Sequence, residues 1–403
     1  MKRSSLVLAS TLILVVVSCS SSRTSAGTPD TTTPDTTTTV PSGAGFYAGP
    51  GALPEGPPGT MVWSTPIDAP AGAKAWKILY KSKSVADKDI VVSGVLVVPD
   101  GPAPTGGRRL VTWAHGTTGV ADACAPSMAT DAATELPAID RFVKDGYVVV
   151  ASDYEGLGTP GLHPYLVGES EGRGVLDAVR AARGFTEAHA GGDVAIYGYS
   201  QGGHAALFAG QMAATYAPEL HIVGDVAGAP VGDLKALMPV ATNIAKFRGF
   251  AVMGGFGFSA AYPEADLKVL LTPEAYELGR QQVEKVCVQG MLTAFEDPAM
   301  TVYTKNPLDV APWPDLLTEN TPGSAGIGFP VLALQGLADQ LVPPAVTESW
   351  RKRACALGTP IELKTYPGLD HGPTAAASAP DAATWIEDRF AGTAFVDGCA
   401  LSP

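Results

Sequence analysis

The chain has 403 residues and a formal net charge of −13, with 46% hydrophobic and 17% charged residues. So much apolar material with so little charge argues against disorder across the body of the chain and is enough for one large core. The acidic balance disfavours nucleic acid as a partner, because phosphate binding needs clustered Lys and Arg. It carries no information about the type of reaction.

The N-terminus has the pattern of an export signal over residues 1–18. Lys2 and Arg3 precede an apolar run of about a dozen residues, which is too short to span a bilayer but suits a signal-peptide core. The run ends in VVSC at residues 16–19, which resembles a bacterial lipobox with Val16 in place of the usual Leu. We therefore expect Cys19 to carry a diacylglycerol and to anchor the protein at the outer face of the cell membrane. An ordinary secretory signal with an incidental cysteine is the alternative.

Residues 19–45 are mostly Ser, Thr, Pro and Asp, and such a stretch cannot bury enough surface to fold. We expect it to be a flexible tether in front of a domain at residues 46–403. The cysteines other than Cys19 are even in number, as in exported proteins with disulfides. They are Cys124, Cys287, Cys355 and Cys399. Three pairings are compatible with their spacing.

From about residue 46 onward, strand-like and helix-like segments alternate. Strands are expected at residues 90–98, 109–114, 147–152, 193–199, 331–335 and 360–366. Helices are expected at residues 174–189, 201–216, 346–356 and 382–390. Several of the strands are apolar runs without alternation, as expected of central strands buried on both faces. This order predicts an α/β fold with a mostly parallel sheet flanked by helices.

Residues 231–315 interrupt this alternation, because they contain no clear buried strand. They carry helix-like runs, a glycine-rich stretch at 254–257 that we expect to be flexible, and large apolar side chains without strand periodicity. We interpret this segment as a mainly helical cap or lid inserted over the sheet. An irregular continuation of the core is the alternative.

The pentapeptide GYSQG at residues 198–202 matches the nucleophile elbow G-x-S-x-G. Its Ser200 follows a strand-like run and precedes a helix of small residues, as the sharp strand-to-helix turn requires. A second match, GESEG at 168–172, follows no strand, and two carboxylates flank its Ser170, which would oppose negative charge on the serine oxygen. We therefore predict Ser200 as the nucleophile and Ser170 as the N-cap of the following helix.

The partners of such a serine follow it in the order acid, then histidine. Asp339 comes just after a late strand, where the acid belongs, and His371 follows the last strand. His371 would act as general base and then general acid, and Asp339 would hold the imidazole tautomer. Asp370 competes with Asp339, but its side chain is expected to point elsewhere because it is adjacent to His371. A turn-forming role for Asp339 is the alternative.

The loop HGTTG at residues 115–119 follows a predicted strand, at the position that supplies an oxyanion N–H in such enzymes. We expect an oxyanion hole formed by the backbone N–H groups of Gln201 and Thr117, with Thr118 as the alternative to Thr117. A plain glycine-rich turn is the competing interpretation. No histidines and acidic residues show metal-ligand spacing, so we predict no catalytic metal and no cofactor.

Four motifs in this order resemble the secretory lipase family typified by the yeast lipase A from Candida antarctica, in its bacterial branch. They are WAHGTTG at 113–119, CAPS at 124–127, DYEG at 153–156 and GYSQGG at 198–203. The resemblance runs from about Gly51 to the C-terminus. It implies an α/β-hydrolase fold with an inserted helical cap and the triad Ser200, Asp339 and His371. The loop HGTTG departs from the yeast pattern, in which an acidic residue before the first disulfide cysteine contributes to the oxyanion hole.

The resemblance further implies the disulfides Cys124–Cys287 and Cys355–Cys399, and a substrate that is a lipid or another ester. The expected activity is hydrolysis of acyl esters, including acylglycerols, through an acyl-enzyme. Large apolar residues of the insertion would line an acyl tunnel or present a surface to lipid, and the alternative is that they form the core of the cap itself. These are Phe247, Phe250, Met253, Phe256 and Phe258. A peptidase or acyltransferase on the same scaffold, or a non-catalytic surface lipoprotein, are the alternatives.

Overall fold

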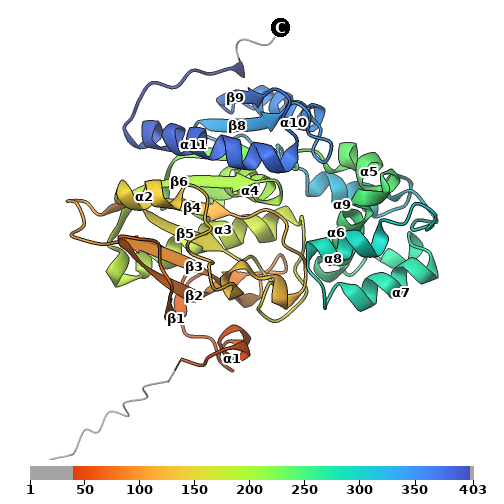
Figure 1. The fold of residues 1–403 in the computed structure, drawn as a ribbon, viewed down its shortest axis with the longest axis horizontal. Helices are drawn as coiled ribbons and strands as arrows, with labels where there is room; N and C mark the ends of the chain where they lie inside the picture. Colours follow the sequence, from red (N-terminus) through yellow and green to blue (C-terminus); the bar gives the residue numbers. More distant parts are fainter. Residues whose placement is uncertain (1–39, 400–403) are drawn as a thin grey trace, which may run out of the picture. The chain divides into compact units, whose positions relative to one another are not determined.

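Within the described residues 40–399 of this computed structural model, nine strands form one sheet in the order β1-β2-β3-β5-β4-β6-β7-β8-β9 (Figure 1). The strands are β1 Met61–Ile67, β2 Ala73–Lys83, β3 Asp89–Pro99, β4 Arg108–Ala114, β5 Val148–Ser152, β6 Ala190–Tyr199, β7 His221–Gly228, β8 Val331–Gly336 and β9 Ile361–Tyr366. The pairs from β1 to β5 are antiparallel, and those from β5 to β9 are parallel. The predicted fold, with a mostly parallel sheet, is therefore confirmed. The expected signal peptide, Cys19 and most of the tether lie outside the described residues.

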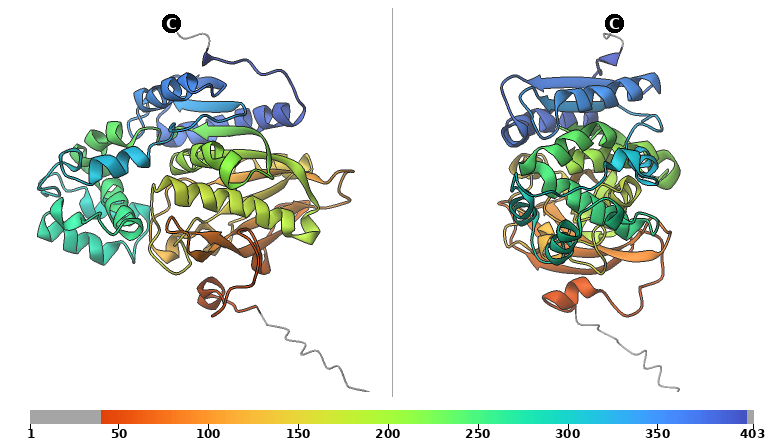
Figure 2. Two further views of the ribbon diagram at one scale, coloured as in Figure 1. Left: turned by 180° about the vertical axis from the view of Figure 1, so that it is seen from behind. Right: turned by 90° about the vertical axis from the view of Figure 1, so that its right-hand side faces the viewer.

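The central strands are buried on both faces, which explains their uninterrupted apolar sequences. In β5, Val148 and Val150 pack into one cluster with α3 (Gly168–Gly184) and α4 (Gln201–Tyr216). Val149 between them packs on the opposite face with α2 (Ile139–Lys144) and α11 (His371–Phe390). Helices α2 and α11 lie in front of the sheet in Figure 1, and the view from behind in Figure 2 brings α3 and α4 forward.

Five helices follow β7 and precede β8, and they gather on one side of the sheet (Figure 1). They are α5 Leu234–Asn243, α6 Arg248–Ala261, α7 Pro273–Gln282, α8 Val288–Phe295 and α9 Trp313–Glu319. Most of their apolar side chains share a separate cluster around Val252, Met253 and Phe295. No helix between residues 40 and 399 is long and apolar enough to cross a membrane.

The glycine-rich stretch 254–257 is part of helix α6, and the expectation of a flexible segment there was wrong. These glycines allow close packing instead. A Cβ on Gly257 would lie 2.5 Å from the backbone nitrogen of Tyr165, and one on Gly255 would lie 2.5 Å from Leu267. The missing side chains therefore let α6 approach the loop before α3, and this gain outweighs the poor helix propensity of glycine.

Two disulfides join distant segments. Cys124, in the loop after β4, pairs with Cys287 at the start of α8, and Cys355 near the end of α10 (Pro344–Ala356) pairs with Cys399. The first bridge closes a separation of 163 residues. Chain-entropy arguments give about 5 kcal/mol for a loop of that length. It attaches the helices between β7 and β8 to the loop after β4, the strand that pairs with β6.

Several element boundaries differ from the sequence prediction. Helix α3 begins at Gly168 and not near residue 174, so Ser170 lies inside it and is not its N-cap, which is Val167. Ser170 donates its hydroxyl to Glu155 instead, at 2.6 Å. Helix α11 begins at His371, much earlier than the expected residue 382. Helix α1 (Ala44–Ala48) starts two residues before the expected domain.

One buried carboxylate has a consequence for stability. Asp225 of β7 is fully buried, and among the described residues neither of its carboxylate oxygens has a hydrogen-bond partner. Burial raises the pKa of Asp225 well above its usual value. The unfolded chain then loses this proton first as pH rises from about 4, so the folded state loses stability with rising pH.

We predict that Asp225→Asn, which cannot ionise, raises the unfolding temperature relative to the parent protein by more at pH 8 than at pH 4. Thermal unfolding followed by circular dichroism at the two pH values measures this difference. Asp131→Asn, at an exposed position, serves as the control. An equal effect of Asp225→Asn at both pH values would show that the buried carboxyl does not titrate as argued.

Candidate active site

Ser200 lies on the sharp turn between β6 and α4, with φ 60° and ψ −117°. These backbone angles are strained for a residue with a side chain. Two hydrogen bonds hold them: the Ser200 N–H donates to Gly228 O at 2.8 Å, and the Ser200 carbonyl accepts from His204 N at 3.0 Å. The turn is thus fixed both by the neighbouring strand β7 and by the first turn of α4.

The glycines of the elbow are required by close backbone approaches. A Cβ on Gly202 would lie 1.8 Å from Ala114 O, at the end of β4, and one on Gly198 would lie 2.0 Å from Gly202 O. Neither contact can be relieved by moving a flexible side chain. The motif therefore reflects the crossing of α4 over the ends of β6 and β4, which only hydrogen atoms at these positions permit.

Ser200, His371 and Asp339 form a hydrogen-bonded chain, although 139 and 171 positions separate the serine from the acid and the base. His371 Nε2 lies 2.9 Å from Ser200 Oγ, and His371 Nδ1 lies 2.7 Å from Asp339 Oδ2. A carboxylate accepts only, so Nδ1 carries the proton and Nε2 is free to accept from the serine hydroxyl. This is the arrangement in which a histidine removes a proton from serine.

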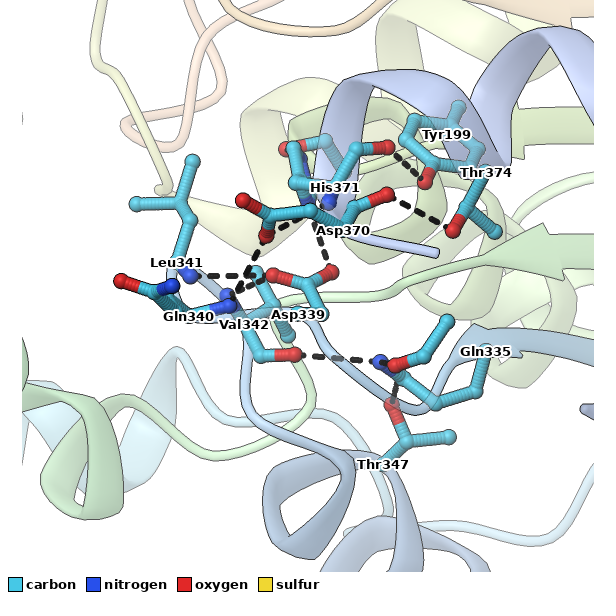
Figure 3. Close-up of polar contacts among 12 residues, drawn as sticks. Tyr199, Gln335, Asp339, Gln340, Leu341, Val342, Thr347, Asp370, His371 and Thr374 are labelled. Atoms are coloured by element: carbon cyan, nitrogen blue, oxygen red, sulfur yellow. Dashed lines mark hydrogen bonds and ion pairs between the residues drawn. The ribbon is translucent and has the colours of Figure 1, made fainter. Parts of the chain in front are cut away.

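Asp339 is buried, and its second oxygen accepts from the backbone N–H groups of Leu341 and Val342 at 2.9 and 2.8 Å (Figure 3). The turn after β8 therefore aims the other oxygen at His371. Asp370 does not compete for the imidazole. Its carboxylate accepts from the backbone N–H groups of Gln340 and His371, and these bonds lower the pKa of Asp370. Asp370 is the N-cap of α11, which presents His371 in the first turn of that helix.

Tyr199 is a supporting residue that the sequence analysis did not identify. Its hydroxyl donates to the carbonyl of His371 at 2.6 Å, and its ring lies 5.3 Å from the imidazole (Figure 3). The residue before the nucleophile thus holds the backbone of the histidine. Its place inside the elbow motif was a signal, but only the fold shows that its hydroxyl reaches α11.

The two residues expected to supply oxyanion donors are Gln201, which follows Ser200 in the chain, and Thr117. Gln201 is the first residue of α4, so its N–H has no partner within the helix and lies at the positive end of the helix dipole. Thr117 lines the same cavity as Ser200, and its hydroxyl is 2.8 Å from that of Tyr165. Thr118 instead offers its carbonyl to the N–H of Val288, beside the disulfide. Of the two threonines, only Thr117 is among the residues that line the cavity with Ser200.

An apolar cavity opens from Ser200 between the sheet and the helices α5, α6 and α9. The space between its walls, counted together with the open solvent at its mouth, is about 860 Å³. Apart from the hydroxyl-bearing residues Ser200, Thr117, Tyr165 and Tyr303, its walls are almost entirely hydrophobic. Met253, Phe256 and Phe258 belong to the core cluster of the inserted helices, and Phe250 packs against it. Phe250 and Phe258 also line the cavity, so the core of the insertion and the cavity wall share residues.

Two further histidines, His163 and His204, form hydrogen bonds to neighbouring protein groups. His163 donates from Nδ1 to Glu155 O at 2.8 Å, and burial lowers the pKa of His163 to about 4. His204 lies on α4, buried behind the nucleophile, and bonds to Glu171. In the described part of the chain no three His, Cys, Asp or Glu side chains gather in a way that could hold a metal ion.

A mostly parallel sheet, a strained serine between strand and helix, and an inserted cap define the class as an α/β-hydrolase. The sequence model of the family described as secretory lipase matches residues 124–398. The chain belongs to the secretory lipase family, and it is a secreted hydrolase of the lipase and esterase type.

Similar proteins include named lipases, a solved lipase structure and a protein named as an inactive lipase. The secreted triacylglycerol lipase LIP4 of Malassezia globosa is 28% identical, over 81% of this chain and 75% of that protein. The X-ray structure of Candida antarctica lipase A in its closed state superimposes with a TM-score of 0.75 and 23% identity, covering 87% of each chain, which shows a shared fold. A Mycobacterium tuberculosis protein named "Probable inactive lipase MT1628" is 26% identical, over 89% of this chain and 84% of that protein.

Proposed function

We propose that this enzyme hydrolyses acyl esters, including acylglycerols, through Ser200 as nucleophile, His371 as base and acid, and Asp339 as the residue that orients the histidine. The observation that carries the proposal is the continuous chain of hydrogen bonds from Asp339 Oδ2 to Ser200 Oγ, with the serine in the wall of an apolar cavity. The fold supplies the strained turn, and the cavity supplies a place for a hydrocarbon chain.

In the first half of the reaction, Ser200 Oγ attacks the ester carbonyl while His371 Nε2 takes its proton. The oxyanion of the tetrahedral intermediate lies near the N–H groups of Gln201 and Thr117, where preorganised donors stabilise developing charge. His371 then protonates the departing alcohol, and the acyl group remains on Ser200. Water then attacks the carbonyl carbon of the acyl-enzyme while His371 takes its proton. The bond to Ser200 Oγ breaks, His371 returns the proton to Oγ, and the carboxylic acid leaves.

A relative named as an inactive lipase makes a non-catalytic role a genuine alternative for this family. The intact hydrogen-bond geometry of Ser200 and His371 argues for activity in this chain. A peptidase is less well supported, because the cavity wall carries no acidic side chain that would bind a peptide amine. The lining favours an uncharged, apolar acyl group.

We further propose the division of the chain into a signal peptide at 1–18, a tether from Cys19 to about residue 45, the hydrolase domain and its cap at about 231–315. The lipobox-like end of the apolar run supports lipidation of Cys19, which would hold the enzyme at the outer face of the cell membrane. The disulfides fit an oxidising compartment outside the cytosol.

For the triad, we predict that Ser200→Ala lowers hydrolysis of nitrophenyl esters by at least about 10³-fold, because the acyl-enzyme cannot form. The rate is measured with a series of esters from short to long acyl chains. Activity that rises toward long chains supports a lipase, and activity on short chains alone supports a simple esterase. Full activity of the variant on any ester would refute Ser200 as the nucleophile.

The cavity predicts a chain-length effect at Gly254, which lines it and has open space where a Cβ would lie. Gly254→Phe should lower the kcat/KM for a C16 ester relative to a C4 ester by about tenfold or more, since the ring fills room needed by the chain. Ala260→Phe places the same side chain on an exposed position of α6 and is the control. Equal losses for C4 and C16 would mean that the chain does not occupy this cavity.

For the anchor, we expect the mature full-length protein from a bacterial host to carry a diacylglyceryl group on an N-terminal Cys19. Mass spectrometry of the N-terminal peptide measures this directly. Cys19→Ser should move the enzyme from the membrane fraction to the soluble fraction, because it removes the site of attachment. An unmodified N-terminus at another residue would identify an ordinary secretory signal.

A further inference from the structure

The carboxylate of Glu171 is fully buried behind the nucleophile and is not part of the triad. It lies on α3 and is contacted by three groups from two segments, the loop before α3 and the helix α4. Leu166 N and Gln201 Nε2 donate to its Oε1 at 3.0 and 2.8 Å, and His204 Nδ1 lies 2.7 Å from its Oε2. A buried carboxylate is costly unless such partners satisfy it, so this cluster has a fixed geometry.

The bond from Gln201 Nε2 to Glu171 fixes the side chain of Gln201. One hydrogen of its amide points to Glu171, and the other points to His163 Nε2 at 2.8 Å. His163 Nε2 can accept because Nδ1 carries the proton and donates to Glu155 O. A flipped amide would place its oxygen against the carboxylate, so only one orientation is favourable. The side chain of Gln201 is therefore held from two sides, and its backbone N–H beside Ser200 is held with it.

The bond from Leu166 N to Glu171 fixes the loop before α3, which also lines the cavity. Leu166, which donates its N–H to Glu171, has φ 61°, a backbone conformation that needs external support in a residue with a side chain. The preceding residue, Tyr165, bonds through its hydroxyl to the Thr117 hydroxyl at 2.8 Å. Thr117, Tyr165 and Leu166 all line the cavity with Ser200. Glu171 thus supports the loop whose Tyr165 is hydrogen-bonded to the Thr117 side chain.

The third bond extends the cluster toward the inserted helices. His204 Nε2 lies 2.8 Å from Asn320 O, at the end of α9, and the Asn320 amide donates to Tyr262 Oη at 2.9 Å. The Asn320 side-chain oxygen accepts from Gly168 N, at the start of α3. Through His204 and Asn320, the cluster around Glu171 therefore links α4 to α3 and to the end of the insertion.

From these contacts we propose that Glu171 is a positioning residue that sets the spacing of the two oxyanion donors, Gln201 N–H and Thr117 N–H, around Ser200. The inference rests on the proposed function, which assigns those donors. Glu171 itself touches no substrate. Its effect is exerted through the Gln201 side chain on one side, and through Leu166, Tyr165 and Thr117 on the other.

The experiment compares kcat and KM for a C4 nitrophenyl ester in the full-length protein and its variants. Glu171→Ala should lower kcat by about 10- to 100-fold with little change in KM, since oxyanion contacts act mainly in the transition state. Glu171→Gln should restore most of that kcat. Its amide oxygen can accept from Leu166 N and Gln201 Nε2, and its amide nitrogen can donate to His204 Nδ1, which leaves the His204 Nε2–H for Asn320 O.

Asp177→Ala is the matched control. Asp177 is also a fully buried carboxylate on α3, bonded to Ser82 and Tyr216, and its partners do not line the cavity. It should lower the unfolding temperature and leave kcat unchanged. If Glu171→Ala changes kcat no more than Asp177→Ala does, Glu171 has a structural role only and the proposal is overturned.

Two further variants separate the outcomes. Tyr165→Phe removes only the hydroxyl that reaches Thr117, and it should lower kcat by about 3- to 10-fold. It tests the proposal even if Glu171→Ala does not fold, and an unchanged kcat for this variant would then overturn it. If Ser200→Ala remains active, the proposed function itself is wrong. If Ser200→Ala is inactive while Tyr165→Phe and Glu171→Ala keep full kcat, only the role of Glu171 is wrong.

Discussion

The close crossing of α4 over the end of β4 is the constraint on which the site depends. The carbonyl of Ala114 occupies the space of a side chain at Gly202, so the helix begins almost in contact with the sheet. This proximity forces the strained angles of Ser200 and exposes its hydroxyl at the carboxyl end of the parallel strands. The same end of the sheet carries the turns that bear Asp339 and His371, which is why residues so distant in sequence meet there.

The parts of the fold that could be predicted from sequence are those in which local chemistry alone determines the structure. The buried runs of β5 and β8 are apolar throughout, and α4 begins directly after the serine as the motif demands. Strand β7 was missed because His221–Gly228 mixes a charged residue and two glycines into a short run. The carboxylate of Asp225 is buried without a hydrogen-bond partner among residues 40–399, a state no pattern of hydrophobicity would suggest. The start of α3 was missed because its first turn is polar, yet this turn is buried against Phe208 and Met212 of α4.

The site divides in the same way. Asp339 and His371 could be predicted from their order along the chain and from the strands before them, since the α/β-hydrolase fold determines that order. Tyr199 and Glu171 could not, because their roles come from hydrogen bonds across segments that only folding brings together. Glu171 even lies inside the second G-x-S-x-G match, where its charge served only as an argument against Ser170. Its value to the site depends on the neighbours it meets when buried.

The inserted helices explain how general triad chemistry becomes selective. A Ser–His–Asp chain activates the serine toward any reachable acyl carbonyl, so by itself it does not select among esters, amides and thioesters of similar shape. Here the serine faces a wall built by α5, α6 and α9, and a disulfide and the buried cluster at Asn320 attach those helices to the core. An apolar acyl chain gains free energy along that wall, whereas a charged or strongly hydrated group would lose its water without replacement. Under the proposed function, selectivity therefore belongs to the insertion, where glycines of α6 line the cavity, while the sheet positions Ser200, Asp339 and His371.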